Sequence, residues 1–191
     1  MRDAGLASMV YFYFDFKDTS KQSARALLTS FLIQRSAQSD ACCDILSGLY
    51  SAYEAGSKQP SDDALGECLR DMLAIPGQGP VFIVLDALDE CPQSAGTPSP
   101  RERVLNIVEW IANLHYSHLH LCVTSRPEAD IQVVLETLAS HTVSLHNESG
   151  QMDDINNYIK FFIKTNASTR KWREQDQELV ISKLSQQAGG M

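Results

Sequence analysis

Four short apolar runs, separated by segments of helical pattern, constrain the fold of this chain more than any other feature. Each run is rich in Val, Ile, Leu or aromatic residues and is predicted to be a β-strand. The runs lie at residues 9–16, 81–85, 119–124 and 142–145. Strands that alternate with helices and are nearly all apolar are typical of parallel sheets. We therefore expect an α/β fold with helices over both faces of the sheet.

The segments between these runs carry apolar residues at helical spacing. The clearest start signal is in "SPRERVLNIVEWIANL", where Ser99 and Glu102 form a capping box and Pro100 takes the first helical position. A proline is tolerated there because the N–H that it lacks would have no partner inside the helix. Helices are predicted at residues 21–36, 41–55, 61–75 and 100–114, after Pro127, near 152–164 and at 174–188.

Composition narrows the domain count and the classes of partner. The 191 residues, 43% of them hydrophobic, suit one domain with a substantial core, and no internal repeat divides it. The formal charge is −8, with 16 Lys and Arg against 24 Asp and Glu. Nucleic acid is therefore not expected as a partner, because phosphate backbones are bound through basic side chains.

Cysteine usage and hydropathy indicate a cytoplasmic setting. The five cysteines are an odd number without CxxC spacing, so neither a disulfide framework nor a zinc site is predicted. A reducing compartment fits this pattern. No apolar run approaches the roughly 18 residues that a membrane span needs, and we expect neither an anchor nor a signal peptide.

Acidic residues follow the second run in "VFIVLDALDEC". Asp86 comes directly after the strand, where a side chain at the carboxyl end of a parallel strand can reach a ligand. Carboxylate oxygens suit Mg²⁺, so Asp86 is a candidate metal ligand. Asp89 and Glu90, one turn further on, are candidates to polarise an attacking water. The alternative is a solvated acidic loop without chemistry.

Two polar residues follow the third run in "LHLCVTSRPE". Ser125 and Arg126 come at the end of what we expect to be a neighbouring parallel strand, so they would face the same crevice as Asp86. A guanidinium matches the geometry of phosphate oxygens. The alternative for Arg126 is a solvated residue ahead of a helix that starts after Pro127.

Together the two motifs resemble those of NACHT-type STAND NTPases, in the nephrocystin-3-like branch common in fungi. "VFIVLDALDEC" looks like the Walker B strand, "LCVTSRPE" like the sensor 1 strand, and "VYFYFDFKDTSKQSARALLTSFLIQ" like the strand and helix after the P-loop helix. "DDINNYIKFFI" and "LSQQAGGM" are similar to the last helices of that domain. The resemblance implies a P-loop NTPase-like sheet of the ASCE class, with strand order 5-1-4-3-2.

The resemblance also implies ATP or GTP bound with Mg²⁺, slow hydrolysis, and a signalling switch. Asp86 matches the aspartate that coordinates Mg²⁺, and Asp89 and Glu90 match the acidic pair that orients water. Arg126 matches the sensor arginine near the γ-phosphate, and Ser125 beside it is expected to contact the nucleotide.

The sequence departs from that family in one respect. It contains no GxxxxGK[ST] motif, and none of its seven lysines follows a glycine. We therefore expect residues 1–191 to be a partial NACHT-like domain that lacks the P-loop strand, binds nucleotide weakly and is inactive alone. The implied partners are the parent's upstream P-loop segment, a downstream winged helix and repeats, and other copies of the parent in a homo-oligomer.

Two other functions remain open on sequence grounds. The chain could be a non-catalytic protein-interaction module that keeps the shell of an NTPase, or a Mg²⁺-dependent hydrolase built on "DALDE" alone.

The absent P-loop strand also has a consequence for the sheet, because it leaves residues 119–124 with an exposed flank and residues 142–145 without their neighbour. A three-stranded sheet with a loosely placed fourth strand is expected.

Overall fold

The computed structural model describes residues 7–93, 96–144 and 149–188. The chain forms two compact units, Met1–Ala139 and Ser140–Met191.

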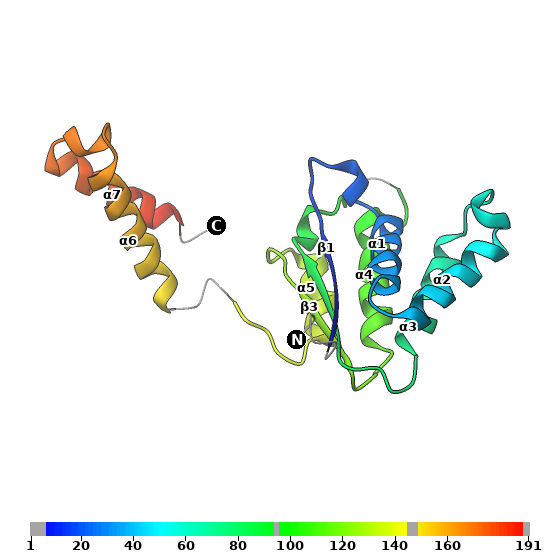
Figure 1. Ribbon diagram of the computed structural model, residues 1–191. Coiled ribbons are helices and arrows are strands. Elements are labelled where there is room, and N and C mark those ends of the chain that lie inside the picture. The colour runs from blue at the N-terminus through cyan, green and yellow to red at the C-terminus, as the bar shows by residue number, and fades with distance from the viewer. Residues whose placement is uncertain (1–6, 94–95, 145–148, 189–191) are drawn as a thin grey trace. The chain divides into compact units, whose positions relative to one another are not determined.

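The first unit alternates strands and helices in the predicted order (Figure 1). The capping box of Ser99 and Glu102, with Pro100 at the first helical position, is confirmed. None of the described helices is both long and apolar enough to cross a membrane. The elements are β1 (Ser8–Tyr13), α1 (Ala24–Ser36), α2 (Asp40–Ala52), α3 (Asp62–Leu73), β2 (Val81–Asp86), α4 (Pro100–Ala112), β3 (Leu119–Val123) and α5 (Ala129–Leu138), with short 3₁₀ turns at Thr19–Lys21, Glu54–Gly56 and Leu88–Glu90.

The three strands form one parallel sheet in the order β1-β2-β3, which confirms the α/β class. Ser8 lies beside Val81, and Val81 lies beside Leu119. The strand predicted at residues 142–145 is wrong for residues 142–144, which form no strand, and Leu145 lies outside the described residues. Residues 142–144 pair with no strand in the described part of the chain.

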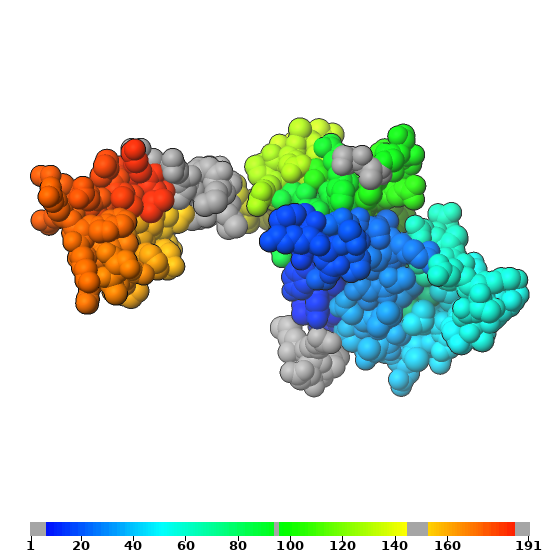
Figure 2. All heavy atoms as spheres, turned by 90° about the horizontal axis from the view of Figure 1, so that it is seen from above, coloured from blue at the N-terminus to red at the C-terminus, as the bar shows by residue number. Residues whose placement is uncertain are grey.

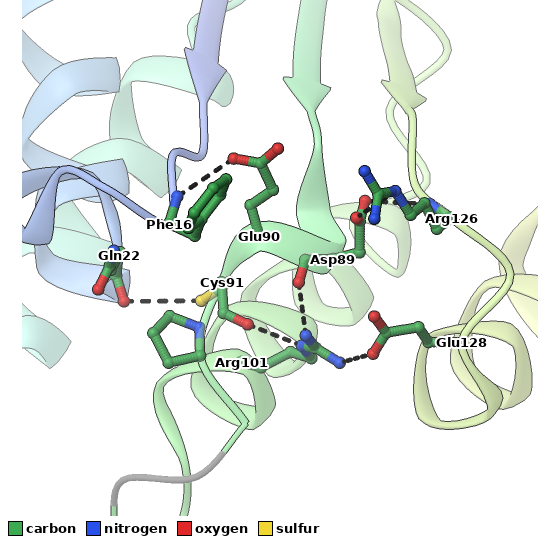
Figure 3. Close-up of a pocket in the computed structure, with 9 residues that line it drawn as sticks. Phe16, Gln22, Asp89, Glu90, Cys91, Arg101, Arg126 and Glu128 are labelled. Atoms are coloured by element: carbon green, nitrogen blue, oxygen red, sulfur yellow. Dashed lines mark hydrogen bonds and ion pairs between the residues drawn. The ribbon is translucent and has the colours of Figure 1, made fainter. Parts of the chain in front are cut away.

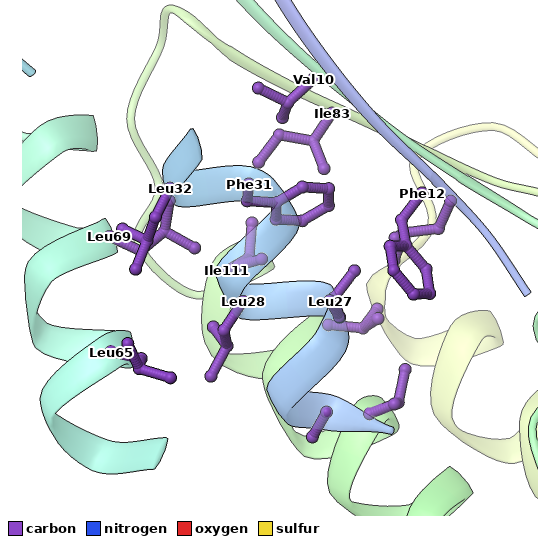
Figure 4. Packing of buried hydrophobic residues seen from close by; sticks show 14 of the residues in the cluster. Val10, Phe12, Leu27, Leu28, Phe31, Leu32, Leu65, Leu69, Ile83 and Ile111 are labelled. Carbon is purple, nitrogen blue, oxygen red and sulfur yellow. The ribbon is translucent and has the colours of Figure 1, made fainter. Parts of the chain in front are cut away.

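One face of the sheet forms the core with α1, α3 and α4 (Figure 4). Val10 and Phe12 of β1 and Ile83 of β2 point into this core, where Phe31 and Leu27 of α1 meet them. All five side chains are buried. Alternate residues of a strand point to opposite faces, so burial of the even residues in β1 and the odd residues in β2 defines one packed face.

The opposite face differs from the predicted cover of both faces. Met9, Tyr11 and Tyr13 of β1 and Phe82 of β2 lie there, and they are 38–52% exposed among the described residues. Tyrosine and methionine count as apolar in a sequence pattern, yet they tolerate a wet surface. The strands therefore have one buried and one exposed face, although their sequences contain almost no polar residues.

The outer edge of β1 is closed by two glutamines of α1. Gln38 accepts a hydrogen bond from Met9 N–H and donates one to Met9 C=O, both at 2.9 Å. Gln34 does the same for Tyr11, at 3.0 and 2.8 Å. One helical turn separates the glutamines, and their amides repeat the pattern that a neighbouring strand would offer. The exposed edge of β1 thus keeps its backbone groups satisfied.

The second unit contains two helices, α6 (Ser149–Thr165) and α7 (Glu174–Ala188), which contact each other around a 3₁₀ turn at Thr169–Lys171. Ile163 is its buried apolar residue among those described. Thr169 donates a hydrogen bond to Ile163 C=O at 2.8 Å and so ties the turn to α6. Tyr158 and Phe162 stack on the exposed surface of α6.

Candidate functional site

The carboxyl ends of β2 and β3 are joined through Thr124. Its hydroxyl donates a hydrogen bond to Asp86 Oδ1 and accepts one from Ala87 N–H at 3.0 Å. Its backbone accepts from Leu88 N–H at 3.0 Å. Asp86 is half-buried at the last position of β2. The sequence prediction placed residues after these two strands in one crevice, and the contacts show them side by side.

The chain leaves β2 through a left-handed residue. Ala87 has φ 55° and ψ 47°, a conformation that costs an L-residue roughly 1–2 kcal/mol. The turn directs the following 3₁₀ segment, Leu88–Glu90, across the end of the sheet, and Leu88 is buried beneath it. Strain of this kind often accompanies functional turns, because the surroundings must hold it in place.

Asp89 is held by Arg126. Its Oδ1 accepts a hydrogen bond from Arg126 N–H at 3.0 Å, and its Oδ2 lies 3.5 Å from Arg126 Nε. The Asp89 side chain is 8% exposed, whereas that of Arg126 is 81% exposed. The backbone bond therefore fixes the loop, while the guanidinium remains in solvent with one long contact.

Glu90 ties this loop to the segment after β1. Its Oε2 accepts a hydrogen bond from Phe16 N–H at 3.1 Å, and Phe16 lies against it in Figure 3. Seen from above in Figure 2, the blue chain that follows β1 lies beside the green chain of the later elements. The Ser125 hydroxyl donates a hydrogen bond to the neighbouring Arg126 C=O at 2.8 Å. In this state both predicted water-orienting carboxylates accept hydrogen bonds from backbone N–H groups.

A pocket of about 350 Å³ opens at this end of the sheet (Figure 3). It brings together three predicted site residues, Asp89, Glu90 and Arg126, whereas Asp86 and Ser125 are not among its lining residues. The other lining residues are Phe16, Gln22, Cys91, Pro92, Arg101 and Glu128.

Arg101 is a site residue that the sequence analysis missed. Its side chain is 6% exposed. Its Nε donates to Cys91 C=O at 2.8 Å, and a terminal nitrogen donates to Asp89 C=O. The other terminal nitrogen pairs with Glu128 and lies 3.4 Å from Asp130. One guanidinium thus joins the acidic loop, α4 and the start of α5.

The position of Arg101 in the helical repeat of α4 could have revealed that its side chain is buried. It lies three and four residues before Val104 and Leu105, which are both buried, so it belongs to the apolar stripe of α4. Burial lowers the pKa of Arg101, but the hydrogen bond and charge of Glu128 and the charge of Asp130 outweigh it, so the net pKa is raised. The guanidinium is charged at every relevant pH.

Cys91, beside Arg101, is an unreactive thiol. It is fully buried, and burial raises its pKa to about 11 despite the opposing charge of Arg101. The thiolate, which is the nucleophilic form, is therefore scarce at neutral pH. Cys68 of α3 behaves alike, because burial and the charge of Asp71 raise its pKa to about 11.

The raised pKa values of these two thiols predict that the protein loses stability at alkaline pH. An exposed thiol ionises near pH 9 in the unfolded chain, whereas the folded thiols stay protonated to about pH 11. Their stabilising effect is complete below pH 9 and is lost as the pH rises to 11, by about 2–3 kcal/mol per thiol. Denaturant titrations of the parent and of Cys68→Ala/Cys91→Ala at pH 8 and near pH 11 test this. An equal fall in both proteins would contradict it.

The donor set restricts the kind of metal that this site can hold. Among the described residues, no group of three or more His, Cys, Asp or Glu side chains is placed to enclose an ion. Asp86 offers a half-exposed carboxylate, which is the donor that Mg²⁺ uses together with waters and phosphate oxygens. A hard cation shared with a ligand therefore fits, and a closed protein cage does not.

Comparison with known families decides the relationship of the chain. The family model described as "Nephrocystin 3, N-terminal" matches residues 2–126. The chain belongs to this family. The nephrocystin 3 N-terminal match covers all three strands and runs through Asp86, Asp89, Glu90, Ser125 and Arg126, so the whole predicted site lies inside it. A search of the curated proteins found no match, and a search of the solved structures found none.

Proposed function

We propose that this chain is the nucleotide-facing part of a NACHT-like switch NTPase and holds a Mg²⁺–nucleoside triphosphate weakly. One observation carries the proposal. The acidic loop with Asp86 and Asp89 and the loop with Arg126 lie together at the carboxyl ends of adjacent parallel strands, where α/β proteins bind ligands. The chain would work in the cytoplasm as one part of a larger signalling protein.

In this proposal Asp86 would hold Mg²⁺, which neutralises phosphate charge when bound. Arg126 would leave Asp89 and bind phosphate oxygens, because its guanidinium is exposed and its contact with Asp89 is long. This movement would free Asp89 Oδ2 for orienting water, while Oδ1 keeps its bond to Arg126 N–H. Glu90 would be free to orient water once its hydrogen bond from Phe16 N–H is broken. Ser125 would contact the ligand beside Arg126.

Binding is expected to be weak, because the chain has no GxxxxGK[ST] loop to cradle phosphates. Calorimetric titration with Mg²⁺–ATP and Mg²⁺–GTP should give a dissociation constant of about 1 mM or weaker, near −4 kcal/mol. Asp86→Asn should remove the Mg²⁺ dependence, and Asp44→Asn, at an exposed position of α2, should not. Micromolar affinity, or Mg²⁺ dependence that survives Asp86→Asn, would contradict the proposal.

A second candidate is the non-catalytic interaction module. The exposed face of the sheet, with Tyr11, Tyr13 and Phe82, favours it, because aromatic side chains are common at protein interfaces. Such a module would bind its partner equally well with Asp86→Asn and without nucleotide. For Asp86→Asn, the first candidate therefore predicts loss of Mg²⁺-dependent nucleotide binding, whereas the second predicts unchanged binding of the partner protein.

A further inference from the structure

Some contacts between the two loops of the candidate site use the side chains that the proposed function assigns to the ligand. The Asp86 carboxylate accepts a hydrogen bond from the Thr124 hydroxyl. Asp89 Oδ2 lies 3.5 Å from Arg126 Nε. A ligand that engages Asp86 and Arg126 would compete with both contacts. Links that leave these side chains free are therefore the ones that can hold the two loops together when the site is filled.

Arg101, at the start of α4, provides such links to the acidic loop. Its backbone N–H donates to Pro92 C=O at 3.1 Å. Its side chain donates from Nε to Cys91 C=O at 2.8 Å and from a terminal nitrogen to Asp89 C=O (Figure 3). One residue thus holds three backbone carbonyls of the segment 89–92, and the proposed function gives none of these carbonyls a contact with the ligand.

The other terminal nitrogen of Arg101 reaches the loop that carries Arg126. It pairs with Glu128, two residues after Arg126, and lies 3.4 Å from Asp130. The Arg101 side chain is 6% exposed, whereas those of Glu128 and Asp130 are 41% and 31% exposed. A single buried guanidinium therefore joins both loops along a path that bypasses the side chains of Asp86 and Arg126.

These contacts require the planar fork of an arginine. A guanidinium offers five N–H donors in a fixed geometry, whereas a lysine ammonium is one compact charge on a flexible stem. A lysine at position 101 would keep the positive charge, but one ammonium cannot reach Cys91 C=O, Asp89 C=O and Glu128 at the same time. Arg101→Lys therefore separates the charge of this residue from its bridging geometry.

We propose that Arg101 is a positioning residue, which keeps Arg126 in place to bind a phosphate oxygen while Asp86 holds the metal ion. The inference rests on the proposed function. It adds that the contribution of Arg126 to ligand affinity depends on Arg101, although Arg101 itself contacts no ligand. Without the bridge, the loop of Arg126 is still tied to the acidic loop through Asp89 and Thr124, but its guanidinium spends less time near the phosphate.

Titration with Mg²⁺–ATP, followed by the amide resonances of residues 86–90, measures this dependence. In the parent chain, Arg126→Ala should weaken binding about fivefold, because one charge-assisted hydrogen bond is lost. In Arg101→Lys, Arg126→Ala should weaken it by less than about twofold, since Arg126 no longer contributes. A fivefold loss in both backgrounds would overturn the positioning role and leave the proposed function standing. Parent resonances that do not respond to Mg²⁺–ATP would contradict the proposed function, and this role with it.

A second variant tests the bridge and does not depend on the folding of Arg101→Lys. Glu128→Ala/Asp130→Asn removes both carboxylates that face Arg101 and leaves its bonds to the acidic loop in place. In this background too, Arg126→Ala should weaken binding by less than about twofold. Glu136→Ala, at an exposed position of α5, is the matched control and should leave the fivefold effect intact. A fivefold effect that survives Glu128→Ala/Asp130→Asn would overturn the proposal, because a role limited to stability leaves the effect unchanged in folded molecules.

Discussion

Arg101→Ala is expected to lower the free energy of unfolding of the first unit by about 3 kcal/mol. Removing one member of a buried ion pair typically costs about 3–5 kcal/mol, because the remaining groups lose their partner away from water. Here the carbonyls of Cys91 and Asp89 would lose a donor. The value lies at the low end, since Glu128 is 41% exposed and water can solvate it.

Denaturant unfolding followed by Trp110 fluorescence measures this effect. Trp110 lies on α4 in the first unit, so a Trp172→Phe background confines the signal to that unit. Arg103→Ala is the matched control, because Arg103 is exposed two residues further along the same helix. Equal losses for the two variants would show that the contacts of Arg101 do not stabilise the unit.

Phe31→Ala is expected to cost about 3–5 kcal/mol in the same measurement. Phe31 is fully buried where α1 packs on the sheet, so alanine leaves a cavity between α1 and the side chains of Val10 and Ile83 (Figure 4). Ile33→Ala is the control, because Ile33 is 63% exposed on the same helix and its loss should cost less than about 0.5 kcal/mol. A loss below 1 kcal/mol for Phe31→Ala would place the core elsewhere.

The helices and the three strands could be predicted because their signals are local. The capping box at Ser99 fixes where α4 begins, and apolar spacing predicts α1. The assembly of the site followed from one further argument. Parallel strands end at the same edge, so Asp86 and Arg126 had to lie near each other, and the bonds through Thr124 and Asp89 agree with this.

The contacts that fix the site are long-range, and helical phase at Arg101 is the local sequence signal that points to any of them. Glu90 bonds to Phe16, which is distant in sequence, and no pattern around either residue indicates the other. Arg101 and Arg103 look equivalent in "SPRER", and only helical phase separates the buried one from the exposed one. The exposure of one face of the sheet was not predicted, because Tyr11 and Phe82 are counted as apolar in a sequence pattern and were expected in the core.

The fourth apolar run, residues 142–145, shows that β-strand propensity alone does not determine a strand. Residues 142–145 have the β-branched composition of a strand, but the described residues 142–144 are not paired. A strand is stabilised by its neighbours, so its composition alone does not make one.

Paramagnetic relaxation by Mn²⁺ tests the central claim most directly. Mn²⁺ binds oxygen ligands as Mg²⁺ does, and with ATP present it should broaden the amide resonances of residues nearest the bound ion. The account predicts strongest broadening at Asp86–Glu90 and Thr124–Arg126, and its loss in Asp86→Asn. Broadening centred on other acidic residues, such as those that begin α3, or unchanged in Asp86→Asn, would contradict it.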